Sequence, residues 1–401
     1  MRDRVLTGAA CVGLISALAA CGTTTATTTT ITGTSLTIYA SVPLNGPEAA
    51  AGRDVYDAEQ LALQQAGGKV GRYKVDLAPP LNDATSTGPS PKLIAANARA
   101  VIQRADAIAY LGELDPNASA QSIPITNADE LLQVSPYDTA IGLTQATSAV
   151  AGSPNVYYES FSTYGRTFGR VVPNDNYQAK ADLQVMQGLG VKKLFIAEDG
   201  GAYGDAIAIA VDQNASKYGI TATAPARSTA GLAQSGADAM FYGGVAGSGA
   251  VQAFTGAVSS GAKVKLFGPG GLDTSSFVSQ LSPAAQSATY LSEPGFTTAE
   301  LPASGQKFLT DFKTAYGHPP ATQAIFGYAA MQVVLNALRG AGVNANNRAA
   351  NINHFYGAKN ISTVIGTLSI NKAGDVSLAP YLFDRVKGGN LVAYKSLIVA
   401  P

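Results

Sequence analysis

The sequence predicts an α/β protein of two similar lobes, each a doubly wound parallel sheet with helices on both faces. Short apolar segments alternate with amphipathic segments of helical length, which is the pattern of strand–helix–strand units. The pattern stops and starts again after residues 173–177, so a second unit follows the first. With 401 residues, the chain is long enough for two domains with substantial cores.

The first lobe contains apolar runs that end in polar loops rich in Gly and Pro, as buried parallel strands do. Strands are expected at 36–41, 73–77, 107–111 and 131–134. Helices are expected at 48–65 and 92–104, where apolar residues recur at helical spacing. A further helix should open at Ala118, with Asn117 as its N-cap.

The second lobe repeats this arrangement, and its strands again run into Gly-rich loops at one end. Strands are expected at 193–197, 237–242 and 264–267, and helices at 178–189, 205–218 and 250–260. The chain then changes to two helical segments and three short strands that we expect to be antiparallel. These are helices 303–316 and 321–341, and strands 367–370, 381–386 and 391–397, with a turn at 371–374.

The segment 151–170 is unusually aromatic for a loop, with Ser, Gly and Pro between the rings. Its aromatic residues are Tyr157, Tyr158, Phe161, Tyr164 and Phe168. Three interpretations remain open: a loop that packs its own aromatics, an aromatic wall over a cleft, or a contact face for a partner.

The N-terminus has the pattern of a signal peptide over residues 1–20, with a short charged head and an apolar run too short to span a bilayer. The run ends in Leu18-Ala-Ala-Cys21, which resembles the bacterial lipobox and implies that Cys21 is lipidated. An ordinary cleavage site with an incidental Cys is the alternative. Residues 21–35 are mostly Thr, which predicts a flexible tether. Because Cys11 leaves with the signal peptide, no disulfide is expected.

Composition argues against several classes of function. Charged residues are only 13% of the chain, with 27 basic and 27 acidic side chains, so nucleic acid is not an expected partner. The two His residues, His318 and His354, lie far apart, so neither a metal nor a cofactor is expected. The stretch 246–249 reads Ala-Gly-Ser-Gly and misses the nucleophile elbow, and phosphate-binding loops are absent from the sequence. We therefore expect no enzyme.

A ligand site is expected at the edge of the first sheet, around residues 105–139. Open α/β sheets bind ligands beyond the carboxyl ends of their strands. A helix that begins at this edge presents unpaired N–H groups and favours an anionic group. The sequence therefore predicts a binding cleft.

Five stretches carry a resemblance to a known family. They are 43–47 (PLNGP), 65–71 (QAGGKVG), 134–136 (VSP), 172–178 (VPNDNYQ) with 203–204 (YG), and 241–244 (FYGG) with 267–269 (FGP). In order and spacing, from Leu36 to near the C-terminus, they resemble the type I periplasmic solute-binding proteins of the branched-chain amino acid receptor family. Members of that family are lipoprotein components of ABC importers.

The resemblance implies the two-lobed type I periplasmic-binding-protein fold with three hinge crossings, near 170–172, 290–293 and 366–369. The first lobe would be 36–171 plus 293–367, and the second 172–292 plus 368–401. A small ligand, an amino acid or a related carboxylate or amide, would bind between the lobes as the hinge closes. The protein would be an exported monomer, anchored at Cys21 to the outer face of the cell membrane, that serves an ABC permease. A lipid-anchored sensor or adhesion module is the alternative.

The resemblance also implies a set of ligand-binding residues. Backbone N–H groups of Asn117, Ala118 and Ser119 would hold the ligand carboxylate, whereas Pro116 has no N–H to offer. Thr139 matches the family's Thr that bonds the ligand amino and carboxylate groups.

Aromatic and glycine positions complete this set. Tyr137 stands where a small residue is usual and would narrow the pocket, and Tyr203 matches the second-lobe aromatic that closes on the ligand. Gly244 and Gly270 belong to the second-lobe loops, and Ala51 stands where the family has an aromatic residue.

One position departs from the family in its charge. Gly270 stands where the family has the acidic residue that pairs the ligand ammonium. Asp273, Asp199 or Glu113 would be candidates to replace it, although each could equally be a solvated loop acid. Without such a carboxylate a buried ammonium would be unpaired and costly, so a less cationic ligand is equally open.

Overall fold

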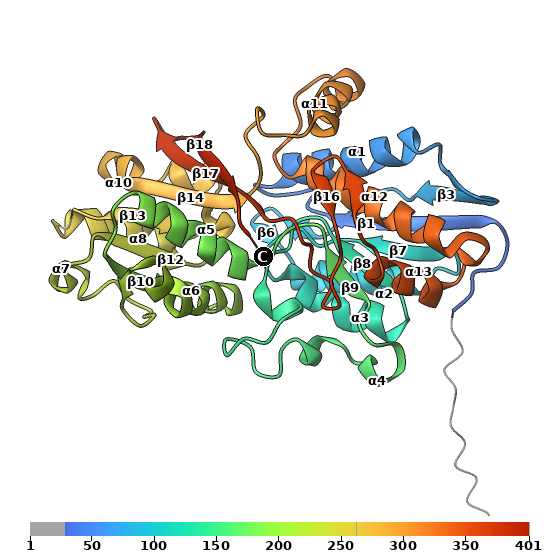
Figure 1. Cartoon of the computed structure of the whole chain (residues 1–401), viewed down its shortest axis with the longest axis horizontal. Helices are drawn as coiled ribbons and strands as arrows, with labels where there is room; N and C mark the ends of the chain where they lie inside the picture. The colour runs from blue at the N-terminus through green and yellow to red at the C-terminus, as the bar shows by residue number, and fades with distance from the viewer. Residues whose placement is uncertain (1–28, 262, 401) are drawn as a thin grey trace, which may run out of the picture.

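The computed structural model describes residues 29–261 and 263–400, which form two α/β lobes side by side (Figure 1). The expected signal peptide, Cys21 and the first part of the expected tether lie outside the described residues. Within the described ranges, no helix has the length and apolar character needed to cross a membrane.

The first lobe is built on a sheet with the order β2-β3-β1-β7-β8-β9, in which β4 also pairs with β1. All neighbours are parallel except β2 and β3, and two small ribbons, β5–β6 and β15–β16, lie outside the sheet. The bounds are β1 Ser35–Val42, β2 Lys69–Val70, β3 Tyr73–Leu77, β4 Leu81–Asn82, β5 Ala84–Thr85, β6 Gly88–Pro89, β7 Ala107–Leu111, β8 Leu132–Ser135, β9 Phe168–Arg170, β15 Ile361–Thr363 and β16 Gly366–Leu368.

Helices cover both faces of this sheet. Apolar residues of α1 and α12 pack with Ile38 and Leu111 on one face, and Val101 of α2 packs with Tyr110 on the other. The bounds of the first-lobe helices are α1 Ala49–Gln65, α2 Pro91–Ile102, α3 Ile123–Ala128, α4 Phe161–Tyr164, α11 Ala303–Tyr316, α12 Ala324–Ala341 and α13 Arg348–Tyr356. Sequence analysis missed β9 and α13, both of which lack a clear apolar period.

The second lobe repeats the architecture with a sheet of order β11-β10-β12-β13-β14-β17-β18. Strands β10 to β14 are parallel, whereas β17 is antiparallel to β14 and to β18, as the expected closing hairpin requires. The bounds are β10 Lys193–Glu198, β11 Thr221–Ala222, β12 Ala239–Gly243, β13 Lys265–Gly268, β14 Thr289–Pro294, β17 Pro380–Lys387 and β18 Asn390–Ile398.

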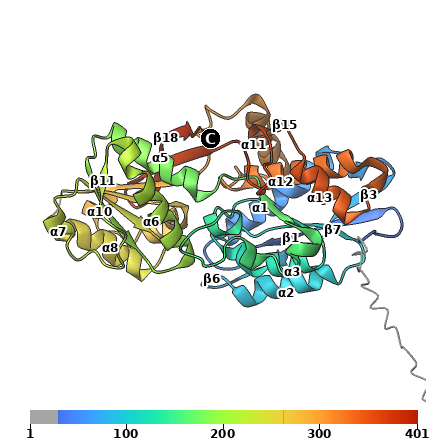
Figure 2. The same cartoon turned by 60° about the horizontal axis from the view of Figure 1, so that its bottom comes forward.

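Two separate cores lie on the faces of this second sheet. Ile196 packs with α5 and α6 on one face, and Phe195 packs with α8, α9 and α10 on the other, as expected from alternating strand side chains. Figure 2 shows these helices flanking the strands. The bounds are α5 Asp175–Gly188, α6 Ala202–Ala215, α7 Leu232–Ser235, α8 Ser248–Ser259, α9 Ser275–Val278 and α10 Pro283–Ala288. The fold class expected from the sequence is confirmed.

The chain crosses between the lobes after β9, after β14 and before β17. Leu368, Ile370 and Val376 belong to the first-lobe core, whereas Ala379 belongs to the second. The third crossing therefore lies between Val376 and Ala379, and its prediction at 366–369 is wrong. The reason is that the β15–β16 hairpin and the turn after it bury their apolar residues in the first lobe.

The end of the expected tether is packed onto the first lobe. Ile31 is buried, and its N–H donates to the carbonyl of Asn346 at 2.8 Å. The N–H of Thr29 donates to the carboxyl of Glu130 at 2.7 Å. The prediction of a flexible tether is thus wrong for residues 29–35, because Ile31 supplies the apolar anchor that the Thr-rich composition hides.

Candidate ligand-binding cleft

A cavity of about 420 Å³ lies between the two lobes, beyond the carboxyl ends of their strands. Its first-lobe wall comes from the loops after β1, β7 and β8, and its second-lobe wall from the loops after β12 and β13 and the start of α6. A volume of this size suits a small organic ligand. Of the predicted site residues, Tyr137, Thr139, Tyr203 and Gly270 line the cavity.

Tyr203 closes the cavity from the second lobe. It stands on the first turn of α6, and the N–H of Gly271 donates to its hydroxyl at 3.3 Å. Its ring packs on first-lobe residues Ile123, Ala140 and Phe168, so it is only 5% exposed. A Cβ on Gly271 would come within 2.9 Å of the Tyr203 ring, which explains the glycine there. The side chain therefore links the lobes around the cavity.

Tyr137 makes a second link between the lobes. Its hydroxyl donates to Glu293 Oε2 at 2.7 Å and lies 2.8 Å from the carbonyl of Pro294. Its ring meets Phe326 of α12 edge to face, with 5.5 Å between centroids. Glu293 and Pro294 stand at the end of β14, so this contact ties the first-lobe wall to the second crossing.

Thr139 is held in the wall by its backbone. The N–H of Asp175 donates to its carbonyl at 3.0 Å. On either side of it, the carbonyls of Asp138 and Ala140 accept from one guanidinium nitrogen of Arg170, at 2.9 and 3.0 Å. Arg170 is fully buried and also pairs with Asp375 at 2.9 Å. The wall at Thr139 is therefore fixed by a buried ion pair.

The predicted carboxylate seat is already occupied by the chain itself. The N–H groups of Asn117 and Ser119 donate to the two carboxyl oxygens of Asp138, both at 2.8 Å, and the N–H of Ala118 donates to the carbonyl of Asp115 at 3.0 Å. None of the three residues lines the cavity. In this conformation their N–H groups are therefore not open to a ligand carboxylate.

Asn117 is also not the N-cap that the sequence predicts. It adopts a left-handed conformation with φ of 65°, its side chain caps nothing, and only a short 3₁₀ turn follows at Ala118–Gln121 before α3. The physical reason is that the N–H groups of Asn117 and Ser119 both donate to the Asp138 carboxyl, which fixes the conformation of the turn.

The two predicted glycines differ in their positions. Gly270 lines the cavity, and a Cβ built there would meet Glu293 only at ordinary contact distance. Gly244 lies behind the lining, where a Cβ would come within 2.6 Å of Asp199. Ala51, where the family has an aromatic residue, does line the cavity.

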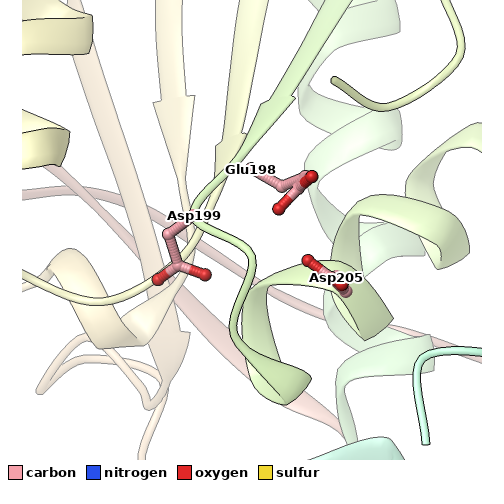
Figure 3. Close-up of side chains that lie close together, drawn as sticks. All are labelled: Glu198, Asp199 and Asp205. Atoms are coloured by element: carbon pink, nitrogen blue, oxygen red, sulfur yellow. The ribbon is translucent and has the colours of Figure 1, made fainter. Parts of the chain in front are cut away.

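Of the three acids considered for the place of the missing carboxylate, only Asp273 lines the cavity. Asp199 accepts hydrogen bonds from the N–H groups of Gly201 and Val245, and thereby holds the loops behind the wall. Figure 3 shows Asp199 with Glu198 at the end of β10, and Asp205 at the start of α6. The guanidinium of Arg227 pairs with both Glu198 and Asp205, so it supplies positive charge to the group formed by Glu198, Asp199 and Asp205.

Glu113 is buried beneath the edge of the first sheet, where the hydroxyl of Tyr110 donates to it at 2.8 Å. Sequence reasoning missed three further acids that line the cavity: Glu48, Asp115 and Glu293. Asp115 stands in a loop that the sequence placed at the sheet edge, whereas Glu48 was taken as the first residue of a helix and is the N-cap residue of α1. Glu293 was taken only as a hinge position.

Burial dominates the electrostatics of these cavity acids. It raises the pKa of Asp115 to about 7, helped by Asp83, Glu48 and Asp138. It raises the pKa of Glu293 to about 8, where the Tyr137 hydroxyl opposes the shift and Asp384 and Glu48 add to it. For Asp273, burial and then Glu293 and Asp384 raise the pKa well above its usual range.

In the aromatic segment, Tyr158 and Phe168 pack within the loop's own lobe, as the first interpretation expects, whereas Phe161 is exposed. Tyr158 is buried against Phe168, Ile123 and Leu143, and its hydroxyl donates to the carbonyl of Leu143 at 3.0 Å. Tyr157 and Phe161 lie at the rim of this cluster, and none of the segment's aromatics lines the cavity. The segment is a loop packed on its own lobe, although Tyr203 reaches into the same cluster.

Comparison with known proteins decides the family. Residues 35–390 match the family described as periplasmic binding protein. The chain belongs to this family. It is 25% identical over 375 residues to the Leu/Ile/Val-binding protein BraC3 of Rhizobium johnstonii, an alignment that covers 89% of this chain and 93% of the relative.

Solved periplasmic binding proteins share the fold. The leucine-binding protein LivK of Thermotoga maritima superposes with a TM-score of 0.72 at 19% identity, covering 91% of this chain and 99% of that one. An ABC transporter solute-binding protein of Rhodopseudomonas palustris HaA2, solved with p-hydroxybenzoic acid, gives 0.69 at 15% identity, with 92% and 98% covered. At these identities the likeness establishes the two-lobed fold alone.

Family membership confirms two expectations from the sequence. The family is one of binding proteins, so the chain is a binding protein and not an enzyme. The family also implies an exported protein that binds a small molecule.

Proposed function

We propose that this periplasmic binding protein captures a small organic solute in the cleft between its lobes and delivers it to an ABC-type membrane permease. The observation that carries the proposal is the cavity of about 420 Å³, whose walls come from both lobes. Tyr203 and Tyr137 each contact the opposite lobe around this cavity. A ligand that touches both walls would favour closure through its extra contacts.

A thermal-shift screen of the protein against amino acids, amides, amines and small carboxylates tests this proposal. A ligand that binds only the folded chain raises the melting temperature, by the equivalent of about 2.7 kcal/mol at a hundred times its Kd. For any compound that binds, Thr139→Ala and Tyr203→Ala should each abolish the shift, measured against the variant's own ligand-free melting temperature. Both side chains line the cavity, and Tyr203 forms its second-lobe wall.

Thr163→Ala and Tyr164→Ala are matched controls, because both residues lie in α4 outside the cavity. They should leave the shift unchanged. A compound whose shift survives both cavity substitutions would place its binding site elsewhere on the protein and contradict the proposed cleft.

We also propose that Cys21 anchors the protein to the outer face of the cell membrane, on the support of the lipobox-like stretch 18–21. Cys21→Ser should move the exported protein from the membrane fraction to the soluble fraction. Cys11→Ser, within the expected signal peptide, should leave it in the membrane fraction. Equal membrane retention of the Cys21 variant in a cell fractionation would contradict the anchor.

A further inference from the structure

The walls of the cleft carry charge of one sign. Glu48 and Asp115 come from the first lobe, and Asp273 and Glu293 from the second lobe and its crossing. Within the described part of the chain, no Lys, Arg or His lines the cavity. Closure thus brings four carboxyl groups toward one enclosed space, where like charges repel and burial disfavours ionisation.

Asp273 is the least satisfied of these groups. Both of its carboxyl oxygens are shielded from solvent and accept no hydrogen bond from a backbone N–H or a hydroxyl group, and the neighbouring carboxyl of Asp384 is close enough to share a proton with Asp273. One carboxyl oxygen from each of Asp273, Glu293 and Asp384 lies within 4.8 Å of the others. A buried acid without a donor is costly, and a ligand that supplies N–H donors and positive charge would relieve the cost.

The anion seat that the sequence predicts in this cleft is not open to a ligand. The N–H groups of Asn117 and Ser119, which face the sheet edge, donate to Asp138, and Pro116 has no N–H. A ligand carboxylate would enter a space with acidic walls and no basic side chain. Such a carboxylate would meet like charge without a basic side chain to pair with, which disfavours its binding.

The rest of the lining has the character of a pocket for an organic body. Pro43, Pro47, Leu114 and Phe277 are apolar, and Tyr137 and Tyr203 present aromatic rings. Aromatic faces attract cations as well as apolar groups. A bare metal ion would leave most of this space unfilled, since even Ca²⁺ needs only a shell of oxygen ligands at about 2.4 Å.

From these observations we propose that the cleft binds an organic amine or ammonium ion that carries no carboxylate, with Asp273 and Glu293 as its main charge partners. This inference rests on the proposed function, because it names the ligand class of the same cleft. It departs from the amino acid and carboxylate ligands that the sequence led us to expect.

The test uses pairs of compounds that differ only in a carboxylate: 3-methylbutylamine with leucine, tyramine with tyrosine, and agmatine with arginine. Affinities for the full protein are measured by isothermal titration calorimetry at pH 8. At least one amine should bind at least about tenfold more tightly than its amino acid, the factor expected for one charge-assisted hydrogen bond. Ca²⁺ and Mg²⁺ are titrated in parallel.

Asp273→Asn and Glu293→Gln should each weaken amine binding about ten- to a hundredfold, because each removes a charged acceptor. The control Glu159→Gln removes the same charge from an exposed side chain outside the cavity and should change the affinity less than about twofold. Asp273→Asn should melt at or above the wild-type temperature at pH 8, since it replaces a buried carboxyl that is costly to ionise by a neutral group of the same shape; this measurement separates lost binding from lost folding.

Binding of the amine should release protons, because the cation favours the ionised form of carboxyls whose pKa burial has raised to about 7 at Asp115 and about 8 at Glu293. Amine affinity should therefore fall as the pH is lowered below about 8. The groups that face Glu293, namely Tyr137, Asp273, Asp384 and Glu48, contribute no positive charge that would reverse this sign.

Tighter binding of an amino acid or of benzoate than of every amine would overturn the inference and leave the solute receptor intact. Saturable binding of Ca²⁺ or Mg²⁺ that depends on Asp273 would overturn it in favour of a metal site. Failure of all these compounds and of the wider screen to bind would count against both the inference and the proposed function.

Discussion

Replacing Arg170 with Met is expected to lower the free energy of unfolding by about 3–5 kcal/mol, the range for removing one partner of a buried ion pair. The guanidinium is fully buried, and it pairs with Asp375, whose side chain is 1% exposed. Its other N–H groups donate to the carbonyls of Asp138 and Ala140 and to Thr144 Oγ1. The substitution leaves a buried carboxylate and several acceptors with fewer donors. Urea denaturation followed by circular dichroism measures the loss.

Two further variants sharpen this test. Adding Asp375→Leu to Arg170→Met should recover part of the stability, because replacing both charges by apolar groups removes the unpaired carboxylate. Lys74→Met breaks an exposed pair with Asp76 and should cost less than about 1 kcal/mol. A loss of similar small size at Arg170 would show that the pair does not support the fold. Because Arg170 also holds the backbone around Thr139, the single variant should weaken ligand binding too.

The ligand-free protein is expected to become less stable as the pH rises from about 5 to about 8. Burial raises the pKa of Glu293 to about 8 and of Asp115 to about 7, and it also raises the pKa values of Glu113, Asp175 and Asp182. The folded chain keeps protons on these groups that the unfolded chain releases, so unfolding releases protons and rising pH favours it. Each unit of difference is worth about 1.4 kcal/mol, so the combined loss should be on the order of a few kcal/mol or more.

Melting temperatures at about pH 5, 6, 7 and 8 measure this dependence. Glu293→Gln has no carboxyl proton to release and should make the melting temperature depend less steeply on pH. Glu159→Gln, at an exposed position of the aromatic segment, should leave this dependence unchanged. Asp238 and Asp311 have lowered pKa values, from N–H donors and from Lys307 respectively, and their effect is confined to acid below about pH 4. A melting temperature that stays level or rises between pH 5 and 8 would contradict the raised pKa values.

Elements with a strong local signal could be predicted from the sequence almost to the residue. Ala107–Leu111 is a run of apolar residues stopped by Gly112, and it forms β7 with those bounds. The helix Ala303–Tyr316 likewise has its expected limits, with Gly317 at its C-terminal end in the left-handed conformation that favours glycine.

Elements whose stability comes from distant partners could not be predicted in this way. β9 has only three residues, and its Arg170 is buried because Asp375, far away in the sequence, neutralises it. α13 begins at Arg348, whose buried guanidinium donates to the carbonyl of Ala107 and to Asp129. No local hydrophobic period marks either segment.

In the cleft, too, some features could be predicted from the sequence, whereas others depend on contacts between distant residues. Tyr137, Thr139 and Tyr203 follow from position in the family pattern, and all three line the cavity. The occupation of the expected anion seat depends on the direction of one side chain, Asp138, which is 21 residues from Asn117 in sequence, with α3 and β8 between them. The gathering of Asp273, Glu293 and Asp384 depends on the loop after β13 and on two neighbouring strands, β14 and β17, which are far apart in sequence. Neither arrangement corresponds to a characteristic spacing of residues in the sequence, so neither could be predicted from it.

The carboxyl group of Asp138 has a consequence for the ligand selectivity proposed for this cleft. Asp138 belongs to the same chain as Asn117 and Ser119 and is held next to them by the fold. Its carboxyl therefore competes with a free ligand for their N–H groups at an effective concentration of about millimolar or more. A free amino acid must displace this internal competitor before it gains a single bond there. For the ligand class proposed above, this internal carboxyl would therefore disfavour carboxylate ligands, and Asp138→Ala is expected to remove that effect.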